Sequence, residues 1–350
     1  MIVAFDSRAA RDPRGVGRYA KSLLQALRDT AVPPGEVLET HRPRRADVYH
    51  SPWLSGALLR SPCPMVVTLH DLVPLKRRSE YLHTGRRLRL RYLAAQRAVR
   101  VIVPTAAVRR DAIEHLSLEP ERVVVIGKAA AAVMHPRPPH EIEAVQRRFG
   151  LPARYLLWVG GLTHPEPRKQ VAQLAATPRE LPLVLVGPTT RWAHELPDVI
   201  LTDSVTDDEL AAIYSGAHAL VLPSLDEGFG LTTVEALACG TPVVASDLPA
   251  LREVLGSRVT FVEPGDLAGL VRAAEASRRP APAPPPWTWR DAAHATWTVY
   301  ESAVGAALPG PSLGSALRDP RPHFETIVPA RLRRPTDDGA GRPVRTRPGA

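Results

Sequence analysis

The chain has 350 residues, a net charge of +9 and 44% hydrophobic residues, so it is long enough for two globular domains of ordinary size. No stretch approaches the roughly 20 consecutive apolar residues that a membrane-spanning helix needs. The first residues lack a signal-peptide pattern, and the two cysteines lie far apart. We therefore expect a cytoplasmic protein that keeps its thiols reduced.

Positive charge is concentrated in residues 1–150, which hold 26 lysines and arginines against 14 aspartates and glutamates. Such a half can face phosphates or anionic lipid, or it can simply be a solvated basic surface. Aromatic residues make up 5% of the chain and do not alternate with the basic runs. This pattern argues against nucleic acid as a partner.

Short apolar runs alternate with helical patterns in the first part of the chain. The run "MVVTLH" at 65–70 is apolar almost throughout, which is typical of a strand covered on both faces. The predicted elements are strands at 1–5, 65–70, 101–104 and 122–127, and helices at 16–27, 85–99 and 107–116. Prolines interrupt the pattern at 129–140, where we place a linker.

A second alternating series follows the linker. Its predicted elements are helices at 140–149, 168–177, 207–216, 232–239 and 249–255, and strands at 155–160, 182–187, 199–202, 219–223, 242–246 and 259–262. Alternation of this kind predicts parallel sheets with right-handed crossovers. We therefore predict two doubly wound α/β domains, with ligands bound in a cleft at the carboxyl ends of the strands.

The predicted boundaries follow from these two series. The first domain takes residues 1–135, and the second takes residues 140–286. A proline-rich crossover leads to a last helix at 287–303, which we expect to rejoin the first domain. Residues 307–350 are rich in proline and arginine without apolar periodicity, and we predict that they are disordered.

The stretch "DEGFGLTTVEALACG" at 226–240 places Glu227 at the end of a strand, directly before a Gly-x-Gly. Glycines permit close approach of a ligand to the backbone, and the helix that follows offers free N–H groups to a phosphate. Glu235 lies one helical turn further on. Thr232 and Glu235 have the spacing of a capping box, so a purely structural role for Glu235 stays open.

The wider segment "SLDEGFGLTTVEALACGTPVVAS" resembles the E-x7-E signature of family-4 retaining glycosyltransferases, which have the GT-B fold of two Rossmann-like domains. Further segments resemble the family in order, among them "RGVGRYAKSLLQAL", "VVTLHDLVPL", "YLLWVGGLTHPEPRK" and "VTDDELAAIYSGAHALVLPS". The resemblance covers about residues 1–303. It is nearest to the subgroup that uses nucleotide-mannose or similar donors for glycan assembly.

The resemblance implies roles for the two carboxylates and the turn between them. Glu227 would contact hydroxyls of the donor sugar, and Glu235 would bind the ribose hydroxyls. The diphosphate would be held by the backbone of Phe229, Gly230, Leu231 and Thr232.

The resemblance also implies a cationic part of the donor site. Arg168 and Lys169 would neutralise the diphosphate and the leaving group, although a solvated basic helix start is the alternative. Gly15 and Gly17 would let the first helix approach the donor phosphate or the acceptor. Leu162 stands where many relatives have an arginine.

His70 ends a central strand and would orient the donor sugar near the reacting carbon. The implied chemistry is front-face transfer with retention, in which the leaving phosphate takes the acceptor proton. No Asp-x-Asp is found, which agrees with metal-independent transfer and with no cofactor besides a GDP- or UDP-sugar as substrate. The implied acceptor is a glycan or a lipid-linked glycan.

Two features depart from the family. Only about twenty residues separate Leu27 from Asp47, which predicts a trimmed first domain lacking one or two strands. "GKAAAAVMHP" at 127–136 replaces the family's Asn-Gly-Val-Asp turn. A non-catalytic GT-B subunit and a sugar-nucleotide epimerase on the same fold remain alternatives.

The predicted helix at 85–99 carries arginines at positions 86, 89 and 97 opposite a face of Leu88, Tyr92, Ala95 and Val99. It could dock on anionic lipid near a lipid-linked acceptor, at the inner membrane face. The alternative is a helix with one face in the core and a solvated basic face.

Overall fold

The structure is a computed structural model that describes residues 1–12, 15–31, 35–77 and 85–306. The described residues belong to one compact unit, which contains two parallel sheets of six strands each. The predicted disorder of 307–350 concerns residues outside this description.

The first sheet has the strand order β2-β1-β3-β4-β5-β6, with all neighbours parallel. Its strands are β1 (Ile2–Phe5), β2 (Glu36–Glu39), β3 (Val48–Ser51), β4 (Met65–Thr68), β5 (Arg100–Val103) and β6 (Val123–Val125). Every residue of β3 and β4 is buried, as expected for central strands covered on both faces.

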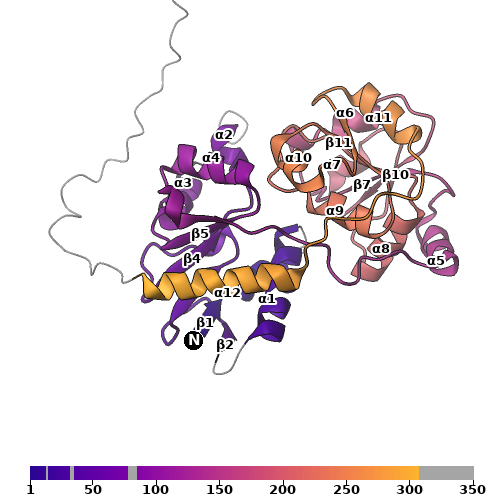
Figure 1. Ribbon diagram of the computed structural model, residues 1–350. Coiled ribbons are helices and arrows are strands. Elements are labelled where there is room, and N and C mark those ends of the chain that lie inside the picture. Colours follow the sequence, from indigo (N-terminus) through magenta and orange to yellow (C-terminus); the bar gives the residue numbers. More distant parts are fainter. Residues whose placement is uncertain (13–14, 32–34, 78–84, 307–350) are drawn as a thin grey trace, which may run out of the picture. The chain divides into compact units, whose positions relative to one another are not determined.

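The helices of this half follow the strands in alternation. Among the described residues they are α1 (Gly15–Thr30), α2 (Val73–Lys76), α3 (Gly85–Gln96) and α4 (Ala106–Leu116), with short 3₁₀ turns at 7–11, 54–56 and 120–122. α1 buries Tyr19, Leu23, Leu24 and Leu27, because these residues recur on one helical face. The last helix, α12 (Trp289–Gly305), packs beside α1 and against β3 and β4 (Figure 1).

The second sheet has the order β12-β11-β10-β7-β8-β9, again parallel throughout. Its strands are β7 (Leu156–Val159), β8 (Leu183–Val186), β9 (Val199–Leu201), β10 (Ala219–Leu222), β11 (Val243–Ser246) and β12 (Thr260–Val262). The direction of winding reverses between β7 and β10. In doubly wound sheets ligands bind at such a switch point, beyond the carboxyl ends of the strands.

The helices of the second half are α5 (Pro139–Phe149), α6 (Val171–Ala176), α7 (Arg191–His194), α8 (Asp207–Gly216), α9 (Leu231–Ala238), α10 (Pro249–Leu255) and α11 (Leu267–Glu275). A 3₁₀ turn at Pro167–Lys169 precedes α6. Capping boxes start α8, with Thr206 and Glu209, and α12, with Thr288 and Asp291. Residues 126–138 form no helix or strand and connect β6 to α5.

One predicted boundary is wrong, and two strands were not predicted. The first half has the unpredicted strands β2 and β3, and its sheet has six strands. That this half is trimmed relative to the family stays a prediction. β2 reads "EVLE" and lies at the sheet edge with one buried residue, so it carries little apolar signal. The helix predicted from 168 begins only at Val171, because Gln170 has a φ of 48° and separates α6 from the preceding 3₁₀ turn.

Candidate functional site

A cleft of about 490 Å³ lies at the carboxyl ends of both sheets. Residues that follow β1, β4, β7 and β10 line it, so it includes the switch point of the second sheet. The predicted site residues found in its lining are Gly15, His70, Arg168, Lys169, Glu227, Phe229, Gly230, Leu231, Thr232 and Glu235. The fold thus brings together residues up to 220 positions apart in the sequence.

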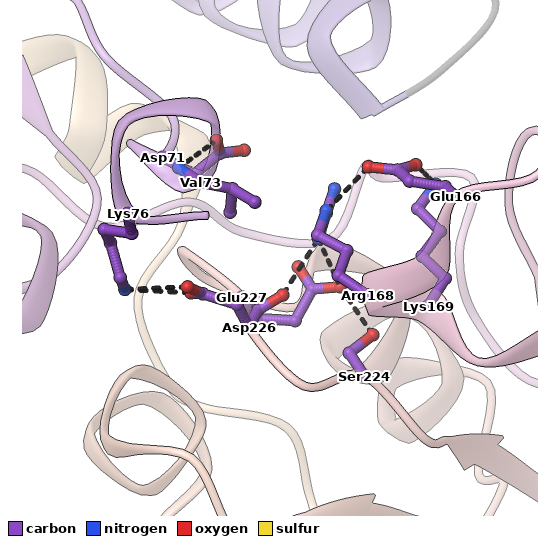
Figure 2. Close-up of polar contacts among 9 residues, drawn as sticks. All are labelled: Asp71, Val73, Lys76, Glu166, Arg168, Lys169, Ser224, Asp226 and Glu227. Atoms are coloured by element: carbon purple, nitrogen blue, oxygen red, sulfur yellow. Dashed lines mark hydrogen bonds and ion pairs between the residues drawn. The ribbon is translucent and has the colours of Figure 1, made fainter. Parts of the chain in front are cut away.

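Glu227 lies in the loop between β10 and α9. Its Oε1 accepts hydrogen bonds from the Ser224 hydroxyl at 2.9 Å and from Arg168 Nη1 at 3.3 Å (Figure 2). The same arginine nitrogen donates to the carbonyl oxygen of Asp226 at 2.9 Å. These contacts hold one oxygen of the carboxylate, and its side chain keeps 18% of its exposure. A partly exposed, oriented carboxylate can accept hydrogen bonds from a bound sugar.

Arg168 and Lys169 share the carboxylate of Glu166. Arg168 Nε donates to Glu166 Oε1 at 2.6 Å, and Lys169 Nζ lies 3.0 Å from Glu166 Oε2 (Figure 2). Burial alone would raise the pKa of Glu166, but the two cations outweigh burial and lower that pKa to about 2. Both cations are mostly buried side chains on the 3₁₀ turn. They are therefore held in the cleft, and the picture of a freely solvated helix start does not apply.

The turn before α9 depends on two glycines. A Cβ on Gly228 would lie 2.0 Å from the carbonyl oxygen of His70, so only glycine allows this loop to cross the end of β4. Gly230 is the N-cap of α9 with a φ of 76°. No side chain caps this helix start, so its first N–H groups remain available to an anion. The Phe229 ring is buried in the core, and only its backbone can serve a ligand in the cleft.

Glu235 does not act as a helix cap. Its Oε2 accepts from Arg18 Nη1 at 2.7 Å and from the Tyr214 hydroxyl at 3.2 Å. Burial raises the pKa of Glu235 despite the opposing effect of Arg18. Its Oε1 is buried and has no hydrogen-bond partner among the described atoms. The capping-box alternative is wrong, and the free oxygen fits an acceptor for a ligand hydroxyl.

His70 lies at the end of β4 with its ring against Tyr19. The Nε2 atom of His70 is 2.9 Å from the Pro52 carbonyl, which can only accept, so Nε2 carries the proton. Nδ1 is then an acceptor, and it is buried without a partner among the described atoms. Burial lowers the pKa of His70 well below its usual value. A neutral imidazole with one free acceptor can bind a hydroxyl.

The two glycines of α1 differ. Gly15 lines the cleft, and a Cβ there would meet nothing within 4 Å. Gly17 is buried outside the cleft lining, and its Cβ would lie 1.8 Å from the Asp12 carbonyl oxygen. Gly17 therefore serves the packing of the helix start, and its predicted ligand contact is not supported by its position.

Several basic residues in the cleft lining or near it were not singled out from the sequence, and of those named here Lys76 lies outside the lining. Lys128 is buried beside the cleft, in the segment after β6. Arg18 on α1 pairs with Glu235. Lys76 pairs with Asp226, the neighbour of Glu227, at 2.9 Å (Figure 2). Isolated basic residues in a basic half give no local signal that distinguishes them from solvated ones.

The predicted basic helix lies outside the cleft lining. Tyr92 and Ala95 of α3 are buried, as expected for the apolar face. Leu90 is 51% exposed, and Arg91 beside it is exposed. The predicted lipid contact stays a prediction.

Comparison with known families assigns both halves of the chain. A family model described as Glycosyltransferase Family 4 matches residues 33–129. A second, described as Glycosyl transferases group 1, matches residues 153–277, which contain Arg168, Glu227 and Glu235. Together they match well over half of the chain. The chain belongs to the family-4 glycosyltransferases.

Individual relatives agree with this assignment. The chain is 28% identical over 241 residues to the serotype-specific mannosyltransferase WbdA of Escherichia coli, covering 61% of this chain and 29% of WbdA. It is 32% identical over 257 residues to the D-inositol 3-phosphate glycosyltransferase of Thermobispora bispora, covering 63% of this chain and 59% of that protein. The chain thus spans less than two thirds of the length of both relatives.

The solved structure of HepE from Anabaena in complex with UDP-glucose is similar to the structure of this chain. The TM-score is 0.63, and the sequence identity is 16%. The match covers 87% of this chain and 98% of HepE. At this identity the likeness shows the fold, which is GT-B.

Two kinds of feature are absent from the described residues. No helix there is long and apolar enough to cross a membrane. No group of three or more His, Cys, Asp or Glu side chains there is arranged to hold a metal ion.

Proposed function

We propose that the protein is a retaining glycosyltransferase that moves a hexose, mannose or a similar sugar, from a GDP- or UDP-linked donor to a glycan or lipid-linked acceptor. The observation that carries the proposal is the grouping in one cleft of the α9 N-terminus, Arg168, Lys169 and two carboxylates. This set offers cations and N–H groups to a diphosphate and acceptors to the hydroxyls on both sides of it. A nucleotide sugar has this order of groups.

In the proposed complex the diphosphate lies at the N-terminus of α9, where Arg168 and Lys169 neutralise it. The ribose hydroxyls donate to the free Oε1 of Glu235. The sugar lies toward Glu227 and toward Nδ1 of His70, which accept hydrogen bonds from its hydroxyls. The side chains of Glu227, Glu235 and His70 are already oriented by the hydrogen bonds described above. Little reorganisation is therefore needed when the donor binds.

In the proposed transfer, the bond between the anomeric carbon and the phosphate oxygen breaks as the acceptor oxygen attacks from the same face. The acceptor hydroxyl gives its proton to the departing phosphate oxygen. The protein's part is to stabilise the charge that develops on the phosphate, and this is the role of Arg168 and Lys169. No step in this scheme requires a metal ion or a further cofactor. Metal-independent transfer is therefore part of the proposal.

The finer assignments rest on relatives. WbdA is a mannosyltransferase, which supports mannose as the sugar, and HepE was solved with UDP-glucose, which supports a nucleotide sugar as the donor. The exposed Leu90 and Arg91 of α3 support a peripheral contact with the inner membrane face, where a lipid-linked acceptor would lie. We propose a cytoplasmic location for the protein as well, since the inner membrane face borders the cytoplasm.

The test is transfer and hydrolysis with a panel of GDP- and UDP-sugars, following release of the nucleoside diphosphate. We expect turnover with at least one donor and a loss of about 100-fold or more for Glu227→Ala. Glu143→Ala is the matched control, because Glu143 is exposed on α5 away from the cleft. No binding and no turnover with any donor would overturn the proposal.

The alternatives give other outcomes of the same experiment. A non-catalytic GT-B subunit would bind a donor without releasing diphosphate in the presence of any acceptor. A sugar-nucleotide epimerase would convert the donor sugar while the diphosphate bond stays intact. The anomeric configuration of the product, read by NMR, tests retention.

A further inference from the structure

Lys128 is a buried cation in the lining of the cleft. It follows β6 in the connecting segment, and its residue is 7% exposed. Its backbone carbonyl accepts from Trp287 Nε1 at 2.5 Å, which fixes the main chain at this point. Its side chain reaches the cleft, where it lies with His70, Asp71 and Glu227 in the lining.

The ammonium group lies among aromatic rings. Nζ is 5.5 Å from the ring centroid of Tyr19 on α1 and 5.4 Å from that of Phe229 in the loop before α9. No described residue forms a hydrogen bond or an ion pair with it. Ring faces stabilise a desolvated cation only weakly, whereas leaving a buried charge unpaired is strongly unfavourable. The site therefore favours an anion beside Nζ.

The other mostly buried cations of the cleft each lie in contact with a carboxylate. Arg168 and Lys169 share Glu166, and Arg168 also contacts Glu227. Arg18 pairs with Glu235. Burial lowers the pKa of Lys128 to about 8, with Asp71 and Glu227 opposing the shift. Lys128 is thus still mainly an ammonium ion at pH 7, and its charge is not matched by a carboxylate in bonding contact.

The neighbours of Lys128 indicate which part of a ligand it meets. Glu227 and His70 are the residues proposed above to bind the transferred sugar. The phosphate next to that sugar is the distal one of the diphosphate, and it carries the leaving oxygen. This phosphate would lie between the N-termini of α1 and α9, which are both positive ends of helices. The ammonium group of Lys128 would be a third source of positive charge beside it.

We propose that Lys128 is a further binding residue for the substrate, whose ammonium group contacts the distal phosphate of the nucleoside diphosphate. The inference rests on the proposed function, since it presumes a nucleotide-sugar donor in the cleft. It assigns to Lys128 the neutralisation of the phosphate that becomes the leaving group. Arg168 and Lys169 then act from the opposite half of the cleft.

The test is calorimetric binding of a nucleoside diphosphate and the matching monophosphate, with GDP or UDP chosen by what the wild type binds. Lys128→Met keeps an unbranched side chain that is one atom shorter and removes its charge. We expect diphosphate affinity to fall about 10-fold to 100-fold, as for the loss of one charged hydrogen bond. Monophosphate affinity should change less than about 3-fold, and Lys128→Arg should restore part of the diphosphate affinity.

Lys21→Met is the control, because Lys21 is an exposed lysine at the cleft, and it should change neither affinity by more than about 3-fold. Thermal unfolding of each variant shows whether it is folded, and removal of an unpaired buried charge should leave the melting temperature unchanged or raise it. Unchanged diphosphate affinity in Lys128→Met, or an equal loss for mono- and diphosphate, would overturn the inference alone. Failure of the wild type to bind any nucleoside diphosphate would overturn the proposed function as well.

Discussion

At the scale of single residues, the two acids of the E-x7-E stretch have different environments. Glu227 is partly exposed and is oriented by Ser224 and Arg168. Glu235 is fully buried, with one oxygen bound to Arg18 and Tyr214 and the other without a described partner. A ribose hydroxyl can therefore bind Glu235 without displacing Arg18, because it needs only the second oxygen.

Glu235→Gln tests this arrangement. We expect the wild type to bind the ribonucleoside diphosphate about 10-fold more tightly than its 2′-deoxy analogue, since the deoxy form leaves a buried oxygen unpaired. Glu235→Gln should lose most of that preference. The measurement is competitive binding of the two nucleotides. Asp207→Asn is the control, because Asp207 also contacts Arg18 but is 52% exposed, and it should keep the preference.

A preference that survives in Glu235→Gln would show that another group reads the ribose. Unequal folding of the variants is excluded by comparing their thermal unfolding in the absence of nucleotide.

At the scale of elements, the start of α1 illustrates how one helix serves both packing and ligand access. Gly17→Ala places a methyl group against the Asp12 carbonyl, whereas Gly15→Ala places one in open space in the cleft. We expect Gly17→Ala to lower the free energy of unfolding by about 1–3 kcal/mol. Gly15→Ala should change it by less than about 1 kcal/mol but weaken donor or acceptor binding.

Denaturant unfolding and substrate titration of the two variants make this comparison. Equal stability of both variants would contradict the packing role of Gly17. Unchanged binding by Gly15→Ala would remove Gly15 from the substrate site.

His50 ties three elements of the first half together. Its Nδ1 is 2.6 Å from the Tyr300 hydroxyl of α12, and its Nε2 is 2.9 Å from the Thr68 hydroxyl of β4. Burial lowers the pKa of His50 from 6.5 to about 3. The unfolded chain therefore binds a proton below pH 6.5 that the folded protein does not, and stability falls as the pH falls toward 3.

The expected contribution of His50 is a loss of about 1.4 kcal/mol per pH unit below about pH 6. His50→Asn should be less stable at pH 7, because it loses these contacts, but its stability should fall less steeply between pH 6 and 5. The free energy of unfolding across this range gives the difference in slope. Parallel slopes would mean that His50 is accessible to protons in the folded state.

At the scale of the whole molecule, much of the architecture follows from periodicity. The central strands β4, β8, β10 and β11 are short apolar runs covered on both faces, and such runs are readily found in a sequence. The edge strand β2 was missed because its outer residues are charged and exposed. α11 was missed although Pro264 and Gly265 mark a turn before it and the Asp266 side chain caps its start.

The site was predictable to the extent that its residues lie in a continuous motif. Glu227 to Glu235 form such a motif, and all its predicted ligand residues line the cleft. Arg18 and Lys128 reach the cleft only through the fold. Arg18 comes from α1 and contacts Glu235 of α9, and Lys128 comes from the segment after β6 and contacts Phe229 in the loop before α9. Contacts over more than 100 positions have no local pattern, so a single sequence does not reveal them.

The most direct measurement is a crystal structure of the protein with the nucleoside diphosphate of its donor. We expect the diphosphate at the N-terminus of α9, beside Arg168 and Lys169, and the ribose hydroxyls on Glu235. The distal phosphate should lie toward Lys128 and Glu227. A nucleotide bound elsewhere on the chain, or a cleft that stays without nucleotide at saturating concentration, would contradict this expectation.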